Sequence, residues 1–167
     1  MKRLILVLSL IICQLSWSSV EAQNVTRTRH QAALTTDAVS TGTLTIRKPD
    51  YICISTDEGR NQLLMDGTKF TMTMGGKLHE TDSQQNPQFD TFQKVLHAVI
   101  NAQPIPECED MTVETKNGQR TITITPSTKK KRQMFTSFVL VVDEKTSAFR
   151  QLRMNERADN YINYDFK

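Results

Sequence analysis

Two segments near each other in the chain decide the fold: Gly42-Thr-Leu-Thr-Ile-Arg-Lys-Pro-Asp50 and Asn61-Gln-Leu-Leu-Met-Asp-Gly-Thr-Lys-Phe-Thr-Met-Thr-Met74. In both, apolar residues alternate with threonines and charged residues. This alternation is typical of strands that have one dry face and one wet face. The sequence therefore predicts a sheet that buries one of its two faces.

The second segment predicts a β-hairpin. A two-residue turn at Asp66-Gly67 is expected to pair Leu63 with Phe70 and Met65 with Thr68. The apolar face of this hairpin, which is rich in methionine, then consists of Leu63, Met65, Phe70, Met72 and Met74.

Further strands are expected around the first segment, over residues 43–47 and 51–55. Their apolar residues occupy alternate positions, so they point to the same face: Leu44, Ile46, Ile52 and Ile54. Pro49 interrupts them and belongs at an edge or a bulge. Tyr51 and Cys53 are expected to point to the other face. Residues 77–85 are interpreted as a polar connection, and residues 23–41 offer at most a short helix.

One long helix is predicted over residues 87–102. Asn86 is a good helix cap, and Pro87 suits the first helical position. The helix ends before Pro104 and Pro106, which lack the amide hydrogen that a helix needs. Its apolar stripe comprises Phe89, Phe92, Val95, Leu96, Val99 and Ile100.

The remaining chain returns to strands. Asn117-Gly118 is a strong hairpin signal that pairs Val113 with Ile122 and Met111 with Ile124. More strands are expected at about 133–142, 147–155 and 160–166. The predicted fold class is α+β: seven or eight antiparallel strands form a curled sheet, an incomplete half-barrel covered by one long helix and a short N-terminal helix.

The N-terminus has the features of an export signal, with a basic start, an apolar run over residues 4–15 and the small residues Val20 and Ala22 before Gln23. We therefore expect a cleaved signal peptide at residues 1–22 and one domain at 23–167. Lipidation at Cys13 is disfavoured because Ile12 precedes it. The net charge of +3 gives no support for a nucleic-acid partner.

The chain offers little for catalysis or metal binding. The histidines at positions 30, 79 and 97 are scattered, and no nucleophile motif is present. We therefore expect a non-enzyme without a metal or another cofactor. Cys53 and Cys108 could form a disulfide in an oxidising compartment, but the sequence does not show whether they are close together.

Three features taken together carry a family resemblance: Ser40 to Asp50, the Leu64-Met-Asp-Gly67 turn and the helix that begins at Asn86-Pro87. In order and spacing the chain resembles the LolA-like periplasmic lipoprotein carriers from about Gly42 to its C-terminus. The resemblance implies an incomplete barrel closed by helices, with an apolar cavity that holds the acyl chains of a lipoprotein on its way to the outer membrane.

The leading hypothesis is a periplasmic carrier or chaperone of an acylated lipoprotein or another lipid. It would act as a monomer, with transient contact to membrane surfaces and possible partners in an inner-membrane release complex and an outer-membrane acceptor. The residues predicted to line the cavity are Leu44, Ile46, Ile52, Ile54, Leu63, Met65, Phe70, Met72, Met74, Phe89, Phe92, Leu96, Ile122, Ile124, Phe138 and Leu140.

Other interpretations remain open at this point. The methionines at positions 65, 72, 74, 111 and 134 could form an adaptable wall for acyl chains or fill an ordinary core. Lys129 to Arg132 could attract anionic lipid headgroups or form a solvated loop. The alternative function is an interaction or sensor module on the same fold, with a filled cavity.

Overall fold

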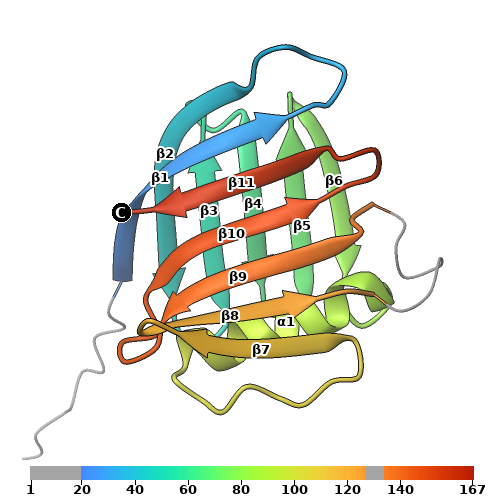
Figure 1. The fold of residues 1–167 in the computed structure, drawn as a ribbon. Coiled ribbons are helices and arrows are strands. Elements are labelled where there is room, and N and C mark those ends of the chain that lie inside the picture. Colours follow the sequence, from blue (N-terminus) through green and yellow to red (C-terminus); the bar gives the residue numbers. More distant parts are fainter. Residues whose placement is uncertain (1–19, 127–133) are drawn as a thin grey trace, which may run out of the picture.

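The computed structural model describes residues 20–126 and 134–167 and contains one antiparallel sheet and one helix (Figure 1). The sheet has eleven strands in the order β6-β5-β4-β3-β2-β1-β11-β10-β9-β8-β7. The first six strands are β1 (Val20–His30), β2 (Ala38–Arg47), β3 (Tyr51–Thr56), β4 (Asn61–Asp66), β5 (Lys69–Met74) and β6 (Lys77–Asp82). After helix α1 (Pro87–Ile100) come β7 (Met111–Lys116), β8 (Gln119–Ile124), β9 (Ser137–Asp143), β10 (Phe149–Asn155) and β11 (Tyr161–Phe166).

The sheet is curled and open, as predicted. Its edges β6 and β7 lie at opposite ends of the strand order, and Figure 1 shows β1 and β7–β11 crossing in front of β2–β6. Helix α1 packs inside this curl. The ring of Phe89 stacks on Phe70 of β5, with ring centroids 4.4 Å apart, and the ring of Phe92 stacks on Phe138 of β9 at 4.5 Å. The helix thus joins the two halves of the sheet.

The alternation in the sequence predicted most of the buried face correctly. Leu63 and Met65 on β4 and Phe70 and Met72 on β5 are all buried in one core. The second hairpin has the predicted register, because Met111 faces Ile124 and Val113 faces Ile122. Its turn places Asn117 and Gly118 at positive φ.

The register predicted for the first hairpin is wrong by two residues. Leu63 pairs with Met72 and Met65 with Phe70, because the turn is centred on Gly67-Thr68 and not on Asp66-Gly67. Gly67 has a φ of +59° at the first central position, which is where a glycine-first hairpin turn needs it. A shift of two residues keeps the same side chains on the apolar face.

The predicted short N-terminal helix is also wrong. Residues 20–30 form β1, which pairs with β2 on one side and β11 on the other. Among Glu21 to His30 of this strand, only Val25 and Arg27 are buried, so hydrophobic alternation is too weak to reveal it. Its polar threonines and arginines hid a strand that lies in the middle of the sheet order.

The polar segment at 77–85 is not a simple connection. Residues Lys77–Asp82 form the edge strand β6, paired with β5. Its side chains are exposed or half-buried, so it is held in the sheet by backbone pairing, with a hydrogen bond from the hydroxyl of Thr68 to Asp82 at 3.2 Å. The described residues form eleven strands, where seven or eight were predicted, and β1 and β6 are among the strands that the sequence pattern did not reveal.

Helix α1 begins at Pro87, as predicted, and ends at Ile100, two residues earlier than expected. Ala102 leaves the helical conformation with a φ of +51°, and its amide donates to the carbonyl of Val99. Among the described residues, no helix is long and apolar enough to cross a membrane. The predicted signal segment up to residue 19 and the Lys129–Arg132 run lie outside the described residues.

Candidate functional site

The apolar residues predicted to line a cavity all lie in one buried cluster between the sheet and α1. Met74 is only partly buried and packs against this cluster, whereas the other predicted residues are at most 5% exposed. The structure therefore brings the predicted set together. We call this cluster the interior.

The interior is closely packed. Among the described side chains it contains a void of about 10 Å³, which is no larger than a single water needs. The void is lined by Leu44, Ile52, Ile54, Leu63, Met65, Phe70, Leu96, Phe149, Leu152 and Phe166. An acyl chain can enter only if side chains or the helix move.

Three of these lining residues, Phe149, Leu152 and Phe166, were not predicted from the sequence. Leu152 and Phe166 follow the alternation of β10 and β11, so their pattern was available. Phe149 does not follow it, because the register of β10 against β9 shifts between Phe149 and Gln151. This bulge turns Phe149 to the same face as Leu152.

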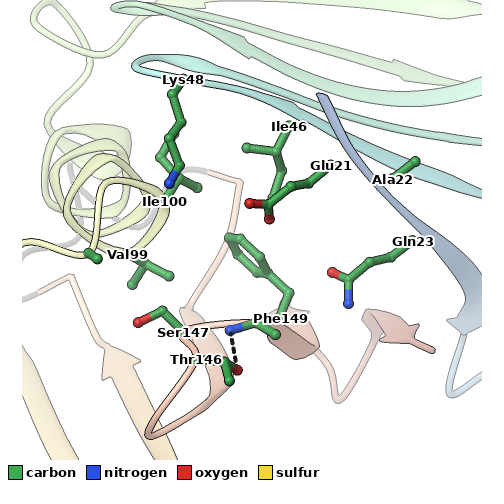
Figure 2. A pocket seen from close by; sticks show the side chains of 12 residues that line it. Glu21, Ala22, Gln23, Ile46, Lys48, Val99, Ile100, Thr146, Ser147 and Phe149 are labelled. Carbon is green, nitrogen blue, oxygen red and sulfur yellow. Dashed lines mark hydrogen bonds between the residues drawn. The ribbon is translucent and has the colours of Figure 1, made fainter. Parts of the chain in front are cut away.

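A larger cavity of about 440 Å³ opens next to the interior (Figure 2). It lies where the start of β1, the end of β2, the end of α1 and the β9–β10 turn meet. Its walls are Gln23, Ile46, Lys48, Val99, Ile100, Ala102, Thr146, Ser147, Ala148 and Phe149, together with Glu21 and Ala22, which belong to the expected signal peptide and would leave with it. We call this cavity the mouth.

Phe149 lines both the mouth and the void in the interior. Figure 2 shows its ring among Ile46, Val99 and Glu21. The ring is 3% exposed and meets the ring of Phe166 edge-on, with centroids 5.7 Å apart. Phe149 is therefore the described side chain that lines both spaces.

Asp143 holds the turn that carries Phe149. Its carboxylate accepts hydrogen bonds from the amides of Lys145 and Thr146, at 3.1 and 2.9 Å, and from the hydroxyl of Thr146 at 3.0 Å. Arg150 donates to the other oxygen at 3.2 Å. The bonds from Thr146 and Arg150 lower the pKa of Asp143 from 3.8 to about 2.

A polar stripe on α1 fixes the helix to the rim of the sheet. Gln93 donates to the carbonyl of Gly67 at 3.3 Å, and Asn101 donates to the carbonyl of Pro49 at 2.8 Å. Between them, Nδ1 of His97 lies 2.5 Å from Oδ1 of Asp50. The three residues are spaced by four, so they lie along one side of the helix. We call these contacts the rim anchor.

The described residues contain no group of three or more His, Cys, Asp or Glu side chains that could hold a metal ion. Cys53 and Cys108 are free thiols, so the disulfide considered from the sequence is not formed. Cys53 lies on the convex face of β3, where Gln62 contacts its sulfur at 3.5 Å, and Cys108 lies in the connection after α1.

Comparisons with known proteins point to one family. The sequence profile of the family described as outer membrane lipoprotein carrier protein LolA matches residues 21–167. No curated protein sequence matches the chain.

Solved structures with a comparable chain path have low identity and low similarity scores. A LolA superfamily protein from Nitrosomonas europaea has 8% identity and a TM-score of 0.36, over 90% of this chain and 84% of that one. A domain of a putative outer membrane lipoprotein-sorting protein from Vibrio parahaemolyticus has 10% identity and a TM-score of 0.40, over 91% and 85%. The lipoprotein LppX from Mycobacterium tuberculosis has 10% identity and a TM-score of 0.37, over 87% and 84%.

Proposed function

The chain belongs to the LolA family of outer membrane lipoprotein carriers, and from this we propose that it is a periplasmic carrier that holds acyl chains in its interior. The observation that carries the proposal is the interior itself, because every residue around its void is apolar. The ligand would be the acyl part of a lipoprotein or another lipid in transfer toward the outer membrane.

Burial of the acyl chain would supply the affinity. Each methylene group that leaves water contributes roughly 0.8 kcal/mol, so several methylenes give a hold that remains reversible. Met65 and Met72 lie in the interior on β4 and β5. Unbranched thioether side chains adapt to ligands of varying shape, which suits a carrier of flexible chains.

The close packing means that binding requires opening. The mouth offers a route, since Phe149 lines both the mouth and the void. Rotation of this ring would connect the two spaces. A larger opening would need α1 to move from the sheet, which breaks the rim anchor at Gly67, Asp50 and Pro49.

The carrier would act as a monomer in the periplasm and would need no catalytic residue or cofactor. Loading and unloading would involve brief contact with a membrane surface or with release and acceptor proteins. Each of these points is part of the proposal.

Uptake of a fluorescent fatty acid by delipidated protein tests the proposal. We expect saturable binding that unlabelled palmitate displaces. Leu63→Asn, at a position 4% exposed, is expected to abolish uptake, whereas the matched variant Leu78→Asn, at a position 59% exposed, binds like the parent protein. Absence of uptake by well-folded parent protein would overturn the proposal.

A second function has one observation in its favour. The void of about 10 Å³ leaves little space among the described side chains that line it, as an interaction or sensor module on this fold would require. Such a module would bind a protein partner and leave its interior closed. Uptake of fatty acid by the parent protein excludes this alternative, and a captured partner together with no uptake supports it.

A further inference from the structure

Arg27 is a buried cation on the concave side of the sheet. Its side chain lies on β1, on the same face as Val25, and the residue is only 7% exposed. β1 lies between β2 and β11, where Arg27 pairs with Ser40 on one side and Tyr164 on the other (Figure 1). Directly paired residues on antiparallel strands project from the same face.

No acidic partner neutralises Arg27. Its Nε has no hydrogen-bond partner, and within residues 20–126 and 134–167 it forms no ion pair. Arg29, two residues further along the same strand, is different because both of its terminal nitrogens bind the carboxylate of Glu156. A guanidinium stays charged at any physiological pH, so Arg27 keeps a buried charge that lacks its counter-charge.

Further polar atoms without partners lie beside it. Oγ of Ser40 and Oγ1 of Thr56 are buried and make no hydrogen bond. Thr56 pairs with Gly42, which is two residues from Ser40 on the same face of β2. Strands β2 and β3 approach closely here, because a Cβ on Gly42 would lie 1.9 Å from the carbonyl oxygen of Ser55.

Tyr164 completes the group as a neutral hydroxyl that is hydrogen-bonded to Arg27. The residue is 4% exposed, and burial raises the pKa of its phenol, although the charge of Arg27 and its hydrogen bond oppose the rise. The phenol therefore keeps its proton. One guanidinium and three hydroxyl groups thus come from four neighbouring strands. They offer hydrogen-bond donors and a positive charge, and no carboxylate pairs with that charge.

This polar group borders the space proposed for acyl chains. Leu44 follows Gly42 on the inward face of β2, and Phe166 follows Tyr164 on β11; both line the void of the interior. An acyl chain that fills the void can therefore place its head near Arg27. A neutral head would leave the buried charge unpaired, whereas an oxyanion would pair with it.

We propose that Arg27, Ser40, Thr56 and Tyr164 form an oxyanion-binding subsite for the acidic head of an acyl ligand. The shared chemistry is a carboxylate or phosphate on an acyl chain, as in a free fatty acid or an anionic phospholipid. The subsite rests on the proposed function, since it names the class of ligand that the interior takes.

The test compares ligands that differ only in the head. Palmitate, methyl palmitate and a lysophosphatidate with the same chain are titrated into the delipidated parent protein and the Arg27→Met and Arg27→Lys variants. We expect palmitate and lysophosphatidate to bind roughly tenfold or more tightly than methyl palmitate, and Arg27→Met to remove this difference. Arg27→Lys is expected to retain part of it, and the stronger of the two acids identifies the natural head.

A purely structural role for Arg27 predicts a different result. Such a role predicts a large fall in the melting temperature of ligand-free Arg27→Met. The subsite predicts that this variant melts at the same temperature as the parent protein or higher, because it loses an unpaired buried charge. Equal binding of acid and ester by all variants, or a large fall in melting temperature for Arg27→Met, overturns the subsite and leaves the carrier proposal intact. Failure of all three ligands to bind the folded parent protein would instead overturn the carrier proposal.

Discussion

Nδ1 of His97 lies 2.5 Å from Oδ1 of Asp50, and this contact ties the middle of α1's polar stripe to the turn between β2 and β3. The stripe is the side of the helix that holds it to the rim, while its apolar side closes the interior. A polar contact of this kind can break and re-form at a modest cost, in contrast to the stacked phenylalanine rings. The strength of the rim anchor should therefore control how often the helix opens.

Replacement of His97 by alanine should loosen the helix. We expect a loss of about 1 kcal/mol in stability, faster hydrogen exchange of the amides of α1 and faster release of a bound fatty acid. Lys94→Ala is the matched control, because it removes an exposed ion pair to Asp90 on the same helix. Equal exchange and release in both variants would mean that the anchor does not hold the helix.

Replacement of Phe149 by alanine should open the route from the mouth. The variant should lose about 3–5 kcal/mol of stability, as for other buried phenylalanines, and should take up fatty acid faster than the parent protein. Leu152→Ala enlarges the same void but does not line the mouth, so it should lose stability without faster uptake. Stopped-flow measurement of uptake separates the two. Similar uptake rates would place the route elsewhere.

Replacement of Gly42 by alanine should damage the sheet. The new Cβ would lie 1.9 Å from the backbone oxygen of Ser55, which cannot move without breaking the pairing of β2 and β3, so we expect a loss of ~3 kcal/mol or more. Gly76→Ala has open space around it and a φ of +79°, so only the backbone conformation costs energy, about 1 kcal/mol. Urea unfolding measures both, and equal losses would contradict the close approach of the strands.

Acid should weaken the turn that carries Phe149. Asp143 has a pKa of about 2 in the folded protein against an ordinary 3.8, so its ionised form stabilises the fold above that ordinary value. This contribution is lost as the pH falls from about 4 to 2. The stability of the parent protein should therefore fall more over this window than that of Asp143→Asn. Parallel pH profiles for the two proteins would show that the turn does not depend on the carboxylate.

The buried face of the sheet and helix α1 could be predicted from the sequence, because Leu63, Phe70 and Phe89 lie in strongly periodic segments. It was insufficient where burial does not follow hydrophobicity. Arg27 is buried although it is charged, β6 is held by backbone pairing, and Phe149 faces inward only because of a bulge. The register of the first hairpin could not be predicted either. Gly67 has a positive φ, and a glycine with positive φ fits both the first and the second central position of a two-residue turn.

A carrier on this fold requires that the interior opens to hold an acyl chain. The most direct measurement is an NMR titration of delipidated protein, labelled on its methionine methyl groups, with palmitate. We expect the methyl signals of Met65 and Met72, both 2% exposed inside the interior, to shift and to saturate as a single site. Unchanged signals from both methyl groups in the folded protein with excess palmitate would contradict the carrier proposal.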